Sequence, residues 1–232
     1  IKGVKNGPSP EWLKTLLAGA GQKSISTLVD ITNFLSLGYC RPLHVFDADK
    51  LKGNILLRTS KAGETLAALN EETYTLPDGA VAVCDDSGVI GLGGIMGGAT
   101  TGVDENTVNV YVEAAYFNPV RITRTGRDLQ IASDARYRFE RGVDPEFTKI
   151  GMDLATQMIL DLCGGEASEI VTAGAMPTWQ RSIDYDPALM TKLIGMDVPA
   201  QKQKEILTAL GFTISGDKTF KVQPPSWRGD IE

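Results

Sequence analysis

The stretch "VNVYVEAAYF", residues 108–117, is typical of a β-strand, because β-branched and aromatic residues dominate it. It closes a series of similar short runs that begins at Asn54 and is interrupted by Pro-Asp-Gly and Asp-Ser-Gly turns. The earlier runs read NILLRTS, TYTL, AVAVCDD and VIGLGGI. Together they predict a sheet or a sandwich in the middle of the chain.

Helical patterns flank these strands on both sides. Ser9 as N-cap and Pro10 at the first helical position predict a helix up to residue 19. A second helix is expected over residues 24–37, and a long third one follows Asp144-Pro145, with a 3.6-residue apolar period that ends at the Gly164-Gly165 pair. The predicted fold class is therefore α+β, with an irregular β-sandwich or mixed sheet core flanked by helices.

The last quarter of the chain has a different pattern. Residues 173–182, AGAMPTWQRS, are typical of a linker. Two short helices (187–194 and 200–210) and a strand near 219–223 follow, which we interpret as part of a small helical module. The predicted domains are residues 1–178 and 179–232. Both ends look cut, so we expect a piece of a longer protein.

Composition excludes several classes of protein. The chain has 232 residues, 42% hydrophobic residues and a net charge of −6, which argues against disorder and against a basic surface that binds nucleic acid unaided. Its three cysteines are far apart and form no CxxC pair, so a zinc ribbon is excluded and a reducing, cytoplasmic compartment is favoured. No signal peptide or apolar run of membrane-spanning length is present, so no membrane partner is expected.

Three features of the central region carry possible chemistry. His44 is the only histidine, which is no evidence for a metal site, and it either packs in a loop or serves a site. Glu113 interrupts an apolar strand, so its carboxylate lies on a wet face or meets a partner inside. The glycine-rich run 91–98 is either a bulged strand or a place where a ligand approaches the backbone; no capped amphipathic helix follows it, which excludes a dinucleotide site.

A local cluster of arginines stands out in this acidic chain. Acidic residues at 128, 134 and 140 lie among them, so a structural ion-pair network is favoured over a phosphate-binding face. The arginines occupy positions 121, 124, 127, 136, 138 and 141.

Several motifs, taken in order, resemble the beta subunit of bacterial phenylalanine–tRNA ligase. They read VDITNF, PLHVFD, GGIMGG, VEAAYF, SDARYRFERGVDP and PPSWRGDIE, and they run through the whole chain. The resemblance implies an editing domain that hydrolyses Tyr-tRNA(Phe) made in error, followed by the start of a small helical module. It further implies the 3′ end of tRNA(Phe) and an alpha subunit as partners, in a heterotetramer of two alpha and two beta subunits. ATP-dependent synthesis would belong to the alpha subunit, with Mg and ATP required by the full enzyme and no cofactor by the editing site.

The resemblance also implies the residues of the editing pocket. His44 and Glu113 would act on the substrate, and Ser133 stands where the family commonly has threonine, which keeps the hydroxyl. Asp230 looks like the first of several acidic magnesium ligands, the others lying beyond Glu232. The remaining substrate-binding residues would be Thr32, Asn33, Gly97 and Ala135.

The chemistry of error correction explains a carboxylate on an apolar strand. An apolar pocket rejects an added hydroxyl by only about a hundredfold, whereas a site that hydrogen-bonds the phenol rejects phenylalanine by about 10⁴ to 10⁵. Hydrolysis of the aminoacyl ester then needs a placed water and a stabilised oxyanion. Whether His44 is a base or positions the substrate stays open, with positioning favoured. A non-catalytic module that binds the tRNA end and a free-standing deacylase are the alternatives.

Overall fold

The computed structural model describes residues 1–231. The chain forms two compact units, one of residues 1–143 and 147–172, the other of residues 144–146 and 173–231. No helix in this described part is long and apolar enough to cross a membrane. The two units are described separately below.

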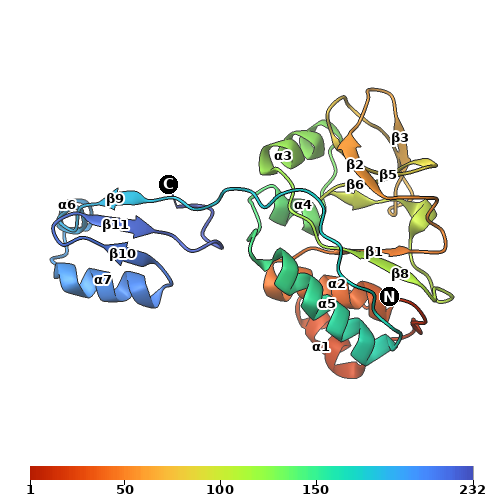
Figure 1. The fold of residues 1–232 in the computed structure, drawn as a ribbon, viewed down its shortest axis with the longest axis horizontal. Coiled ribbons are helices and arrows are strands. Elements are labelled where there is room, and N and C mark those ends of the chain that lie inside the picture. The colour runs from red at the N-terminus through yellow and green to blue at the C-terminus, as the bar shows by residue number, and fades with distance from the viewer. Residues whose placement is uncertain (232) are drawn as a thin grey trace. The chain divides into compact units, whose positions relative to one another are not determined.

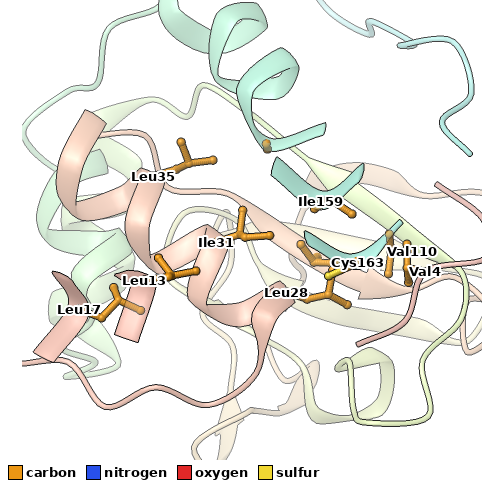
Figure 2. Close-up of a cluster of buried hydrophobic side chains, with 11 residues drawn as sticks. Val4, Leu13, Leu17, Leu28, Ile31, Leu35, Val110, Ile159 and Cys163 are labelled. Atoms are coloured by element: carbon orange, nitrogen blue, oxygen red, sulfur yellow. The ribbon is translucent and has the colours of Figure 1, made fainter. Parts of the chain in front are cut away.

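A helical layer forms one side of the first unit. Three helices pack their apolar faces into one core, in which Leu13, Ile31 and Ile159 are fully buried (Figure 2). All three helices were predicted from the apolar period, but their starts differ: Pro10 itself occupies the N-cap of the first, and the third begins three residues after Asp144. The helices are α1 (Glu11–Gly19), α2 (Thr27–Tyr39) and α5 (Phe147–Cys163).

Ser9 does not cap α1 because it is used elsewhere. Its hydroxyl donates to the carboxylate of Asp30 at 2.6 Å, and the hydroxyl of Ser24 donates to the same oxygen at 2.5 Å. The Asp30 carboxylate also accepts from the backbone N–H of Ile25 at 2.9 Å. This fully buried carboxylate therefore ties the start of α1 to the start of α2.

A two-stranded antiparallel ribbon separates the helical layer from the rest of the unit. It pairs β1 (His44–Asp47) with β8 (Val110–Glu113) and places His44 directly opposite Glu113. Figure 1 shows this ribbon between helices α2 and α5 on one side and strands β5 and β6 on the other. Because side chains alternate along a strand, the ribbon presents one face to each neighbour.

The remaining strands form small antiparallel sheets rather than one continuous sheet. A four-stranded sheet has the order β2-β5-β6-β7, and a separate hairpin pairs β3 with β4. The predicted α+β class is confirmed, and its β core consists of several small sheets. The strands are β2 (Leu56–Thr59), β3 (Thr65–Ala67), β4 (Thr73–Thr75), β5 (Val81–Asp85), β6 (Gly88–Leu92) and β7 (Met96–Gly97), with a 3₁₀ turn at Ala99–Thr101.

Two helices that were not predicted follow β8. They are α3 (Pro119–Asp128) and α4 (Asp134–Phe139). Most of their residues are polar and several are arginines, so their few apolar residues that pack into a core give no clear helical pattern in the sequence. The side chains of Asn118 and Ser133 cap them, each accepting a bond from the backbone N–H three residues later. Ile122 and Phe139 then join a second core with residues of β3, β6 and the loop after β6.

The second unit contains the two short helices and the strand that were expected, and two further strands besides. It contains a three-stranded antiparallel sheet of order β10-β11-β9 beside α6 and α7. Phe212, Phe220 and Val222 form its core. The strand expected near 219–223 is present, and the other two strands, each of three residues, were too short to give a pattern. The elements are β9 (Ile183–Tyr185), α6 (Leu189–Ile194), α7 (Ala200–Ala209), β10 (Thr213–Ser215) and β11 (Phe220–Gln223).

Candidate active site

The β1–β8 ribbon decides which side chains reach the candidate site. On one face, Val45, Val110 and Val112 join the helical core. On the other face, His44 and Glu113 line a pocket, together with Phe46. The carboxylate of Glu113 therefore faces neither open solvent nor the helical core. It faces a cavity that His44 also lines.

This pocket is small and mostly apolar. Its cavity volume is about 70 Å³, on a scale where one water needs about 10–15 Å³, so it holds several water-sized groups or part of a ring. The glycine-rich run supplies one wall through residues 91–97, and Pro42 and Leu43 continue the wall that begins at His44. Val83, Phe117, Ala135 and Phe139 complete the lining.

His44 is an uncharged, enclosed ring. Burial lowers the pKa of its imidazole to about 4, so the ring is neutral at pH 7. Its ring contacts that of Phe46 edge to face, with centroids 4.3 Å apart. The Nε2 atom is shielded from solvent and has no hydrogen-bond partner among the described residues. Because buried ring nitrogens are nearly always paired, this atom calls for a ligand group or an ordered water.

Glu113 is the complementary acidic group. Burial alone raises the pKa of its carboxyl to about 7. Within the described part of the chain, no salt bridge or hydrogen bond engages this carboxylate, so nothing in the pocket offsets its desolvation. It therefore exchanges its proton near neutral pH, and a bound hydroxyl donor would favour the ionised form.

Gly97 makes room for His44. A Cβ built on Gly97 would lie 2.9 Å from Nε2 of the imidazole and closer still to its Cε1, as well as 2.9 Å from Cδ1 of Leu69. Real Cβ contacts are not that short, so even a methyl group would displace the ring. The residues of the glycine run form strands β6 and β7 and also bring backbone to the pocket wall, and the approach of a ligand to this wall stays a prediction.

Ser133 and Ala135 lie at the start of α4. Ala135 lines the pocket directly. The Ser133 hydroxyl donates to the carbonyl of Ile95 at 2.7 Å while accepting from the N–H of Arg136 at 3.0 Å. Ser133 thus fastens α4 to the glycine-rich wall and does not itself line the cavity.

Thr32 and Asn33 do not line this pocket, and Asp230 belongs to the other unit. Thr32 and Asn33 lie on α2, where the hydroxyl of Thr32 donates to the carbonyl of Val29 at 2.7 Å. Asp230 belongs to the second unit, and the guanidinium of Arg228 holds its carboxylate through two bonds of 2.8 and 2.9 Å. This pairing lowers the pKa of Asp230 to about 2. Its role as a magnesium ligand stays a prediction, and among the described residues no cluster of three metal-ligating side chains occurs.

The sequence pattern missed the aromatic lining. Phe46 follows His44 at a spacing of two, so strand alternation puts both on one face. Phe117 and Phe139 contact each other with ring centroids 5.1 Å apart and close the far wall. Phe46 could have been found from its spacing, but Phe139 could not, because the helix that carries it was not recognised.

The arginine cluster divides into two groups. Arg136, Arg138 and Arg141 form ion pairs with acidic residues of α4 and its end, as predicted for a structural network. Arg121, Arg124 and Arg127 lie exposed on α3, and none of them forms a salt bridge within the described residues. Three of the six arginines therefore remain available on the surface.

Comparison with known proteins places this architecture in a family. Residues 1–164 match the B3/4 domain model, and the chain belongs to the B3/4 domain family. Residues 183–232 match the tRNA synthetase B5 domain. The class of protein is thus one that joins these two domains.

Similarity to particular proteins extends over the whole chain. It is 54% identical over 232 residues to the phenylalanine–tRNA ligase beta subunit of Paramagnetospirillum magneticum and 55% identical over 234 residues to that of Rhodospirillum rubrum. Each comparison covers 100% of this chain but 29% of the relative, so the chain spans less than a third of their length. These relatives are named as a subunit of an aminoacyl-tRNA ligase, and the resemblance predicted from the sequence is confirmed.

A solved structure shows a weaker likeness. An N-terminal fragment of the Pyrococcus horikoshii phenylalanyl-tRNA synthetase beta subunit is 16% identical, with a TM-score of 0.41, over 100% of this chain and 65% of that one. A likeness at this level adds nothing to the description of the fold above.

Proposed function

We propose that the pocket is the editing site of a phenylalanine–tRNA ligase, where tyrosine attached in error to tRNA(Phe) is hydrolysed from the tRNA. One observation carries this proposal: the unpaired carboxylate of Glu113 lies opposite the neutral ring of His44 in an otherwise apolar pocket. A tyrosyl side chain matches this arrangement, because its ring suits the apolar walls and its hydroxyl supplies the missing donor.

Selectivity follows from the cost of an unpaired buried acceptor. A phenol hydroxyl donates to the Glu113 carboxylate and offsets its desolvation, whereas phenylalanine leaves that acceptor unsatisfied. A site of this kind rejects the analogue without the hydroxyl by about 10⁴ to 10⁵. Correctly charged Phe-tRNA(Phe) would thus be spared.

The hydrolytic step requires little from the protein. A water oxygen bonds to the carbonyl carbon of the ester, the bond from that carbon to the ribose oxygen breaks, and a proton of the water ends on the ribose hydroxyl. His44, with a pKa of about 4, is a weak proton acceptor at pH 7, which favours a positioning role. The glycine-rich run lines the pocket, and its backbone groups would stabilise the charge that develops on the reacting carbonyl.

The remaining functions belong to the full enzyme. We expect an alpha subunit to bind ATP and magnesium and to charge tRNA(Phe) in the cytoplasm, in an assembly of two alpha and two beta subunits. In that setting the 3′ end of the tRNA reaches this pocket, and Asp230 contributes to a magnesium site with residues beyond this chain. The match of residues 183–232 to a tRNA synthetase domain supports this setting.

A deacylation assay on the assembled full-length enzyme tests the proposal. Tyr-tRNA(Phe) and Phe-tRNA(Phe) are compared as substrates, with Glu113→Ala as the variant. Glu105→Ala is the matched control, because Glu105 is exposed and does not line the pocket. We expect the wild type and the control to hydrolyse Tyr-tRNA(Phe) selectively and Glu113→Ala to lose most of that activity.

Two results contradict the proposal in different ways. Equal hydrolysis of both substrates by the wild type would show that the pocket does not recognise the phenol. Binding of the tRNA end without any hydrolysis would favour the non-catalytic alternative.

A further inference from the structure

Arg41 is a fully buried arginine that joins two parts of the pocket wall. Its side chain has no exposed surface, and its Nη1 donates to the carbonyl of Ala115 at 2.9 Å. Ala115 follows Glu113 by two residues, and Phe117, two residues further on, lines the pocket. The guanidinium therefore holds the segment through which β8 leaves the pocket.

The backbone of Arg41 is fixed independently of its side chain. Helix α2 ends at Tyr39, Cys40 adopts a left-handed conformation with φ of 53°, and the N–H of Arg41 donates to the carbonyl of Leu35 at 3.1 Å. The left-handed Cys40 and this bond end the helix and set the direction in which the chain leaves it. The next three residues, 42–44, all line the pocket.

Helix α5 leaves space for the stem of this arginine. A Cβ built on Gly151 would lie 2.7 Å from Cγ and 3.3 Å from Cδ of Arg41. Gly151 is buried in the helix, so the missing side chain serves the arginine and not a turn. Three elements thus converge on one side chain: the end of α2, the segment after β8, and α5.

We propose that Arg41 is a positioning residue of the candidate pocket, which keeps His44 of β1 in register with Glu113 of β8 by tying the segment 42–44 to the end of β8. This inference rests on the proposed editing function for its kinetic consequence. Arg41 does not line the cavity and acts through the two strand ends.

Loosening of the pocket wall would change the titration of Glu113. Burial raises the pKa of its carboxyl. If the strand ends loosen, water reaches the carboxylate and the pKa of Glu113 falls toward its usual value of 4.5. This fall gives a readout that mere loss of stability would not produce in the folded protein.

The test uses the assembled full-length enzyme with Arg41→Met and Arg41→Lys. Methionine keeps the apolar stem but has no donor, while lysine keeps one donor within reach of the carbonyl. Arg58→Met is the matched control, because Arg58 also donates Nη1 to a carbonyl, that of Thr59 at 3.1 Å, but does not line the pocket. We measure kcat and KM for Tyr-tRNA(Phe) hydrolysis, and the pKa of Glu113 by NMR of its labelled carboxyl.

The proposal expects a fall in kcat of about tenfold or more in Arg41→Met with a smaller change in KM, partial recovery in Arg41→Lys, and no change in Arg58→Met. It also expects the pKa of Glu113 to fall in Arg41→Met. Wild-type kcat and an unchanged pKa in Arg41→Met would overturn it.

Two further outcomes are also decisive. If Arg41→Met does not fold, Gly151→Ala replaces it, since this variant keeps the guanidinium but crowds its stem; a folded Gly151→Ala enzyme with wild-type kcat would overturn the proposal. If the wild type itself does not hydrolyse Tyr-tRNA(Phe), the proposed function fails, and the pKa of Glu113 alone decides whether Arg41 positions the two strand ends.

Discussion

Glu113 lies directly opposite His44 in the antiparallel pairing of β8 with β1, so the two side chains leave the ribbon on the same face. Burial drives their pKa values in opposite directions, to about 7 for the carboxyl and about 4 for the imidazole. Burial therefore shifts both groups toward their uncharged forms. This relationship has consequences for stability that can be measured without any substrate.

Glu113→Gln should make the stability of the chain rise with pH between about 4 and 6.5. In this variant His44 remains, and its folded pKa of about 4 lies below its unfolded value of 6.5, so the unfolded state binds the extra proton in that window. The gain across the window is at most about 3 kcal/mol. Urea unfolding at a series of pH values measures it, and a flat profile would show that His44 is not buried as described.

His44→Gln should produce the opposite slope. Glu113 remains, and its folded pKa of about 7 lies above the ordinary value of 4.5, so the folded state keeps a proton that the unfolded state has lost. Stability is then full below pH 4.5 and falls as pH rises to about 7, by up to about 3 kcal/mol.

The wild type serves as the control for both variants. Its two contributions oppose each other between pH 4.5 and 6.5, so its stability should change little there. A wild-type slope as steep as that of either variant would contradict the opposed pair.

Gly97→Ala should lower hydrolysis of Tyr-tRNA(Phe) in the full enzyme by about tenfold to a hundredfold, and Gly97→Trp should abolish it. The added Cβ strikes the imidazole of His44, so the ring is displaced before any loss of substrate space. Amino-acid activation should remain nearly intact in both variants. Gly38→Ala is the control, because Gly38 is exposed on α2 and its Cβ would meet nothing within 4 Å. Normal hydrolysis by Gly97→Ala would mean that His44 has room to move.

Only part of this site could be predicted from the sequence. The sequence placed Glu113 on an apolar strand and His44 in a separate motif, and the resemblance joined them, but their register depends on pairing across about seventy residues. The capping of α3 and α4 by Asn118 and Ser133 could be read locally in principle, yet the arginines around them obscured the apolar positions. Arg41 was not recognised at all, since nothing in a sequence marks an arginine as buried.

The isolated chain should bind tRNA weakly. Its net charge is −6, and most of the affinity of proteins for nucleic acid comes from phosphate contacts. Arg136, Arg138 and Arg141 are engaged in ion pairs, so α3 offers the exposed arginines of the cluster, Arg121, Arg124 and Arg127. Three phosphate contacts give a weak dependence on salt. The slope of the logarithm of the binding constant against the logarithm of the salt concentration should be about −3 or less steep.

A binding titration with tRNA(Phe) over a range of salt concentrations around 150 mM, close to the physiological value, measures both quantities. The variant Arg124→Gln/Arg127→Gln should reduce the remaining affinity and the slope, while Lys202→Gln, an exposed change in the second unit, reports the background loss of a surface charge. Submicromolar binding with a steep slope would contradict the prediction. It would mean that the arginines of α4 leave their ion pairs to hold RNA, and that the cluster is a phosphate-binding face rather than a structural network.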